Sequence, residues 1–146
     1  GAIENKEVKM AVPEGKRTES KLAVQTKVIE LAEYTITICS NEKNFPKRYR
    51  WCLTNKIVDT ALEIMNDVNT ANSIYVSTKG DYELRRHYQT NALAYTARLL
   101  GLMEVAYIKF NIPDKRIKHW TQLVVDAREL IKKWRKSDSD RFKNFK

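Results

Sequence analysis

The sequence predicts an all-α protein, an antiparallel up-down-up-down four-helix bundle. Apolar residues recur at intervals of three and four along four long stretches, the spacing that aligns side chains on one helix face. The chain contains only 4 Gly and 3 Pro, which is little turn material for a fold of many short strands. The breaks between the stretches are short, and short connections favour antiparallel neighbouring helices.

The periodic stretches occupy residues 20–136, and a chain of 146 residues has the length of a single domain. Residues 1–19 show no sustained periodicity, so we expect them to form a flexible N-terminal arm. Residues 137–146 are expected to form a flexible basic C-terminal tail. The predicted bundle therefore lies between two arms without regular structure.

The first helix is predicted from about Ser20 to Asn41, with Thr18 or Ser20 as the N-cap acceptor. Its predicted core stripe is Leu22, Ile29, Ala32, Ile36 and Cys39. A second apolar row, at intervals of seven, is Val24, Leu31 and Ile38. The apolar arc is therefore wider than one bundle core requires.

The second helix is predicted to begin at Pro46, because the fixed φ of proline suits the first helical position, and to end near Val76. Its predicted core stripe is Leu53, Ile57, Ala61, Ile64, Val68, Ala71 and Tyr75. A flanking apolar row is Trp51, Val58, Leu62 and Met65. This helix should therefore contact two neighbouring helices and keep one face exposed to solvent.

The third helix is predicted from Asp81 or Tyr82 to Asn111, and the fourth begins near Pro113. The third carries one stripe of Leu84, Tyr88, Tyr95, Leu99, Leu102 and Ala106, and another of Leu93, Leu100 and Tyr107. The fourth presents Ile117, Trp120, Thr121, Val124, Ala127, Ile131 and Trp134. The surplus apolar rows either widen contacts within a monomer or are buried between protomers, and we favour a homo-oligomer.

The formal net charge of +9 favours acidic partners. In the predicted topology, one bundle end gathers Lys43, Lys47, Arg48, Arg50, Lys109, Lys115, Arg116 and Lys118. The other end gathers Lys21, Lys79, Arg85, Arg86, Lys132, Lys133, Arg135 and Lys136. Cations in a last helical turn are favoured by the helix dipole, but those at helix starts are not. A functional role is therefore indicated for Lys47, Arg48 and Arg85.

Basic ends of this kind bind a phosphate backbone through counterion release. The residues predicted to contact nucleic acid or a polymerase are Lys47, Arg48, Arg50, Arg85, Arg86, Lys132, Lys133, Arg135 and Lys136. Tyr49, Trp51 and Trp134 lie among basic residues and can either stack on bases or belong to the core. Their helical spacing favours the core.

No catalytic motif is recognisable, so the sequence predicts a non-enzymatic protein without a cofactor or metal. Glu83 and His87 have the spacing of a metal-binding pair, but no further ligand nearby completes a site, and a surface ion pair is the better interpretation. No run of 18 apolar residues is present to span a membrane. Cys39 and Cys52 are too few for a disulfide scaffold, so we expect free thiols and a cytoplasmic location.

Three segments carry a family resemblance: Phe45 to Leu53 (FPKRYRWCL), Ile57 to Ile64 (IVDTALEI) and Ala71 to Tyr75 (ANSIY). Together with the Trp120 region and the closing KKWR from Lys132, they resemble the accessory variability determinant family of diversity-generating retroelements over residues 20–136. The resemblance implies a ring-like basic homopentamer. It also implies binding to the retroelement reverse transcriptase and to RNA or DNA, in support of mutagenic cDNA synthesis, without catalysis by this chain.

Related four-helix proteins encoded in intervening sequences of 23S rRNA genes imply an alternative. They typically carry a Gln-Ile-Arg-Arg-Ala-like second helix and an Asn-Ile-Ala-Glu-Gly-like stretch. Here the corresponding segments are NKIVDTA from Asn55 and ANS from Ala71, which favours the retroelement branch. The alternative is a structural or protein-interaction bundle without a nucleic-acid function.

Overall fold

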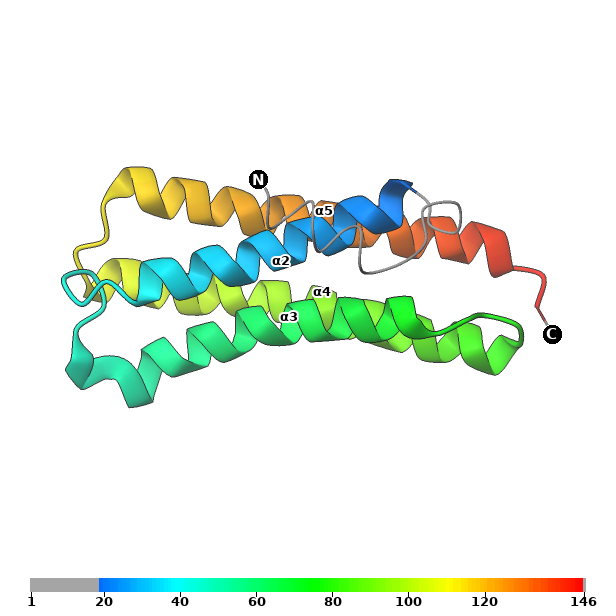
Figure 1. The fold of residues 1–146 in the computed structure, drawn as a ribbon, viewed down its shortest axis with the longest axis horizontal. Coiled ribbons are helices and arrows are strands. Elements are labelled where there is room, and N and C mark those ends of the chain that lie inside the picture. Colours follow the sequence, from blue (N-terminus) through cyan, green and yellow to red (C-terminus); the bar gives the residue numbers. More distant parts are fainter. Residues whose placement is uncertain (1–18, 146) are drawn as a thin grey trace.

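The computed structural model describes residues 19–145, which form four long helices and no strand. The helices are α2 (Glu19–Cys39), α3 (Asn55–Ser73), α4 (Lys79–Lys109) and α5 (Asp114–Phe142). The all-α prediction is confirmed, and the arrangement in Figure 1 is consistent with a four-helix bundle. The predicted N-terminal arm lies outside the described residues except for Glu19, which begins α2.

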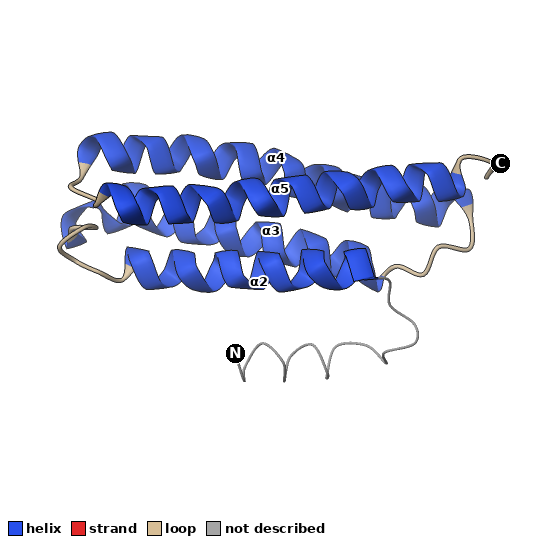
Figure 2. Cartoon of the chain, turned by 90° about the horizontal axis from the view of Figure 1, so that it is seen from above, coloured by secondary structure: helices blue, strands red, loops and turns tan. Residues whose placement is uncertain are grey.

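Each helix packs against two neighbours: α2 and α4 both contact α3 and α5. The connections α2–α3 and α4–α5 lie together on the left of Figures 1 and 2, whereas the connection α3–α4 and the end of α5 lie on the right. We call the first the Trp51 end (residues 40–58 and 107–118). We call the second the Asp138 end (residues 74–90 and 132–145).

The core face of α2 differs from the predicted stripe. Ala32 and Cys39 are buried as predicted, but the other buried residues follow the second predicted row and add two members, giving Val24, Val28, Leu31, Thr35 and Ile38. Ile36, which was expected in the core, is 44% exposed. Thr35 fits the apolar face because its hydroxyl donates to the Leu31 carbonyl oxygen at 2.7 Å and accepts from Trp120 Nε1 at 2.9 Å.

The segment before α3 begins after Pro46, as predicted, but is not α-helical at first. A 3-10 turn, η2 (Lys47–Tyr49), leads into a π-helix, η3 (Arg50–Thr54), before α3 starts. The predicted core positions Leu53, Ile57, Ala61, Ile64, Val68 and Ala71 are all buried. Tyr75 was placed wrongly: α3 ends at Ser73, the chain then extends, and Tyr75 is 86% exposed.

Helix α4 begins with a capping box, in which the Thr78 hydroxyl accepts from the Asp81 amide and the Asp81 carboxylate accepts from the Thr78 amide. Its buried face is Arg85, Gln89, Ala92, Thr96, Leu99, Met103 and Ala106. Leu99 and Ala106 were predicted correctly, whereas Leu84 is exposed. The true stripe includes polar residues, which an apolar pattern cannot detect.

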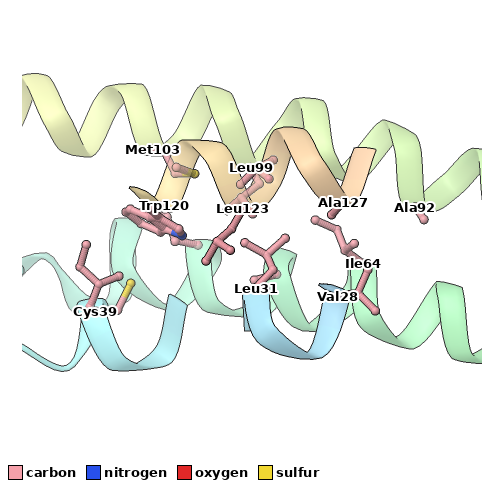
Figure 3. Close-up of a cluster of buried hydrophobic side chains, with 14 of the residues drawn as sticks. Val28, Leu31, Cys39, Ile64, Ala92, Leu99, Met103, Trp120, Leu123 and Ala127 are labelled. Carbon is pink, nitrogen blue, oxygen red and sulfur yellow. The ribbon is translucent and has the colours of Figure 1, made fainter. Parts of the chain in front are cut away.

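Helix α5 buries Trp120, Val124, Ala127, Ile131 and Trp134 as predicted. Figure 3 shows side chains of all four helices meeting in this core, among them Leu31, Ile64, Leu99 and Ala127. The predicted boundary at residue 136 is corrected, because the helix continues to Phe142. Residues 137–142 belong to the fold: Asp138 is buried, and the Phe142 ring lies 5.5 Å from that of Tyr82.

Candidate nucleic-acid interface

The Trp51 end carries a dense group of exposed cations. They come from both connections and from the adjoining helix ends: Lys43, Lys47, Arg48, Arg50, Lys56, Lys109, Lys115, Arg116 and Lys118. The exposed acidic residues within three positions of these cations are Glu42, Asp59 and Asp114. The sequence contains no acidic residue from Lys43 to Val58, so one continuous segment of this end is purely cationic.

Buried aromatic rings fix the position of this cationic segment. Phe45 is buried, and its ring centroid lies 5.5 Å from that of Phe110 and 6.0 Å from that of Trp120. Tyr49 packs on Phe110 with a centroid distance of 5.1 Å. The two connections are therefore joined through a shared aromatic cluster, which holds the cations of both at one end of the protein.

Tyr49 also contacts two of the cations. The Arg48 guanidinium lies 5.0 Å from the Tyr49 ring centroid, and Lys109 Nζ lies 5.5 Å from it. Cations at this distance are attracted by the negative face of the ring. Tyr49 thus brings a cation from η2 and one from the end of α4 to the same ring.

Trp51 is the most unusual side chain of this end, because it is 83% exposed. It lies in the π-helix, where the Asn55 amide donates to the Arg50 carbonyl oxygen. Such i→i+5 turns are rare and occur frequently at functional sites. The predicted placement of Trp51 on the apolar flank of the second helix assumed a continuous α-helix, and the wider turn invalidates that spacing.

Glu42 partly neutralises this surface. Its Oε1 lies 3.6 Å from Lys47 Nζ and 3.9 Å from Arg50 Nη2. All three side chains are at least half exposed to solvent. Exposed ion pairs of this kind are weak. An incoming phosphate can therefore displace Glu42 from both cations.

Arg85, a predicted nucleic-acid contact, is not available on the surface. Its side chain is 5% exposed, and Nη1 lies 3.2 Å from Oδ2 of Asp138, whose side chain is 1% exposed. Arg85 Nη2 also donates to the Ile74 carbonyl oxygen, and Gln89 Nε2 donates to Asp138 at 2.9 Å. Arg85 is thus a core residue that ties α5 to α4 and to the α3–α4 connection, which corrects its predicted role.

The other predicted contacts at the Asp138 end remain at the surface, several of them with partners. Lys132 pairs with Glu129 at 3.9 Å and Lys136 with Asp140 at 3.8 Å. The half-buried side chain of Arg135 donates to the Thr90 hydroxyl. Arg86, also half-buried, donates to the Tyr82 hydroxyl at 3.3 Å, and Lys133 is exposed. The predicted set therefore divides between two ends: Lys47, Arg48 and Arg50 lie at one, and the rest at the other.

Two further buried groups have raised pKa values. Burial and, to a lesser extent, the nearby charge of Glu63 raise the pKa of the Asp67 carboxyl from 3.8 to about 6, and His87 opposes the rise. Burial raises the pKa of the Cys39 thiol to about 12. Cys39 and Cys52 are both free thiols, the first buried and the second exposed.

Comparisons of the chain with known protein families, with curated proteins and with solved structures give no match. Within residues 19–145, no group of three or more His, Cys, Asp or Glu side chains is placed to hold a metal ion. None of the helices in this range combines the length and apolar character that crossing a membrane requires. The cationic Trp51 end is therefore the feature that best defines a candidate site.

Proposed function

We propose that this protein is a non-enzymatic nucleic-acid-binding accessory protein, and that the Trp51 end is its main contact with RNA or DNA. The observation that carries the proposal is the group of exposed cations that the aromatic cluster holds at this end, with Glu42, Asp59 and Asp114 as nearby acids. Each phosphate that these cations neutralise releases a counterion. Binding should therefore weaken steeply as the salt concentration rises.

The sequence resemblance supports a more specific role within this proposal. We infer an accessory protein of a diversity-generating retroelement, which assists mutagenic cDNA synthesis by binding both the reverse transcriptase and nucleic acid. In this role the Asp138 end, with Lys132, Lys133 and Lys136 exposed, provides a second cationic surface for the polymerase or for another stretch of nucleic acid.

The inferred assembly is an antiparallel up-down-up-down bundle that forms a ring-like homopentamer. The course of the chain in Figure 1 supports the antiparallel topology. Exposed apolar side chains on α4, namely Leu84, Val105, Tyr107 and Ile108, support self-association, because large apolar residues on one helix favour burial against another protomer.

A filter-binding titration with RNA and DNA at several salt concentrations tests the proposed contact. Arg48→Glu/Arg50→Glu should raise the Kd and flatten the dependence of log K on log salt. The matched control is Arg98→Glu/Arg128→Glu, which makes the same change in net charge near the middle of α4 and α5. Equal effects of the two variants would attribute binding to overall charge and refute a local site.

The second candidate function is a protein-interaction bundle in which positive charge serves only solubility. One observation supports this function, the exposed apolar residues of α4. It predicts self-association without retention of RNA or DNA at physiological salt, where exposed charges are screened beyond about 8 Å. Light scattering coupled to chromatography, with and without RNA, separates the two functions.

A further inference from the structure

We propose that Trp51 is a stacking platform for an unpaired base, so that the Trp51 end prefers single-stranded nucleic acid to a duplex. This inference rests on the proposed function, because the surrounding cations must first hold the phosphate backbone. It adds the class of nucleic acid and the residue that selects it. Neither follows from positive charge, since a duplex and a single strand both carry phosphates.

The exposure of Trp51 has no explanation in the packing of the chain. The other tryptophans, Trp120 and Trp134, are 0% and 2% exposed and belong to the core. Trp51 is 83% exposed, although a large aromatic side chain gains much stability from burial. A tryptophan held in water by a rare π-turn is therefore available to an external flat, apolar group.

The surroundings of Trp51 indicate the charge of that group. Within the same short segment lie the exposed cations Lys47, Arg48, Arg50 and Lys56, and no acidic residue interrupts it. Protein–protein interfaces are enriched in Trp and Arg but depleted of Lys, and two of these four cations are lysines. A tryptophan amid cations instead fits a ligand that combines flat rings with negative charge, which is the chemistry of a nucleic-acid strand.

Trp51 is better placed for stacking than its neighbour Tyr49. The Tyr49 ring is half-buried against Phe110 and already contacts Arg48 and Lys109. Trp51 therefore offers the accessible ring, while Tyr49 positions the cations that reach the phosphates. Bases of a single strand have open faces that stack on aromatic side chains regardless of sequence. Bases inside a duplex are already stacked, and exposing one requires unpairing it.

The intrinsic fluorescence of the full chain provides a direct test. Since Trp51 is the exposed one of the three tryptophans, stacking should quench the solvent-exposed part of the emission. The probes are oligo(dT) and a blunt-ended DNA duplex with the same number of phosphates. We expect quenching by oligo(dT) and little by the duplex, even where the duplex is bound.

Substitutions separate stacking from phosphate binding. Trp51→Leu should weaken oligo(dT) binding by about 5- to 150-fold, the loss typical of one base–aromatic stack, and leave duplex affinity within about twofold. Trp51→Phe should retain most of the oligo(dT) affinity, because it keeps a ring. Arg48→Glu/Arg50→Glu should weaken both probes.

Each contrary outcome has a distinct meaning. Equal loss for both probes in Trp51→Leu, or unquenched emission at saturating oligo(dT), would refute stacking while leaving the phosphate contact intact. A change in the mass of the assembly in Trp51→Leu, measured by light scattering, would place Trp51 in a contact between protein chains and also refute stacking. If the unaltered protein bound neither probe, the proposed function itself would fail.

Discussion

The buried ion pair between Arg85 and Asp138 allows a quantitative prediction about the stability of the bundle. Asp138→Ala removes the carboxylate that lies 3.2 Å from Arg85 Nη1 and accepts from Gln89 at 2.9 Å. Arg85 then keeps its bond to the Ile74 carbonyl oxygen, but its charge is left buried without a counterion. Breaking a buried pair in this way costs about 3–5 kcal/mol of unfolding free energy.

The magnitude follows from how little solvent reaches the pair. With side-chain exposures of 5% and 1%, water cannot replace the missing carboxylate unless the end of α5 moves away. The double substitution Arg85→Met/Asp138→Leu removes both charges and fills a similar volume. We expect it to be more stable than Asp138→Ala, because no buried charge remains. It should be less stable than the unaltered protein, because Gln89 Nε2 loses its acceptor and the Ile74 carbonyl oxygen loses its donor.

Urea unfolding followed by far-UV circular dichroism measures both effects. Protein concentration must be held constant across variants, because self-association would otherwise shift the apparent stability. A loss below about 1 kcal/mol in Asp138→Ala, or a double variant as unstable as the single one, would refute the reasoning. In the same samples, Arg85→Met should leave nucleic-acid affinity unchanged where the protein remains folded, in contrast to Arg48→Glu/Arg50→Glu.

Three further predictions concern charge, pH and thiol reactivity. Glu42→Gln should tighten RNA binding about 1.5- to 5-fold at low salt, because it frees two cations from a weak surface pair; an unchanged Kd in filter binding would contradict this. The folded pKa of Asp67, about 6, exceeds its ordinary 3.8. Protonation therefore favours the folded state, and the stability from this group falls as pH rises from about 4 to 6. Asp67→Asn should then be the more stable protein above pH 6 in urea, and this advantage should shrink towards pH 4; a constant difference would argue against the assignment. In the native protein a thiol reagent should modify Cys52 quickly and Cys39 only upon unfolding, as mass spectrometry would show; rapid modification of both would contradict the burial of Cys39.

Much of the fold was predictable because the apolar spacing of α3 and α5 is regular. The same spacing would also have located Asp138, which follows Trp134 by four residues, just as Trp134 follows Ile131 by three. An acidic residue on a core stripe requires a buried partner, and Arg85 occupies the matching place on α4. The pair was missed because Arg85 was assigned to the surface with the other basic residues, and because residues 137–146 were assigned to a flexible tail.

The candidate site was predictable only in part. Lys47, Arg48 and Arg85 were singled out because cations near a helix start need an explanation. The first two are exposed at the Trp51 end, whereas Arg85 is buried. The exposure of Trp51 was not predictable, because it depends on a π-turn that no pattern of residues in the sequence indicates. Thr35 was missed in α2 for a related reason: its polarity is satisfied by Leu31 and by a residue far along the sequence, Trp120.

The length of α4 determines how far apart the two cationic ends lie. With 31 residues and a rise of about 1.5 Å per residue, the helix is about 46 Å long. A duplex advances about 3.4 Å per base pair, so it must reach about 14 base pairs before one molecule can touch both ends. Shorter fragments would have to occupy the two ends independently. Where both ends bind nucleic acid, as the proposed function allows, the number of fragments bound per protein molecule should therefore fall once a fragment is long enough to reach from one end to the other.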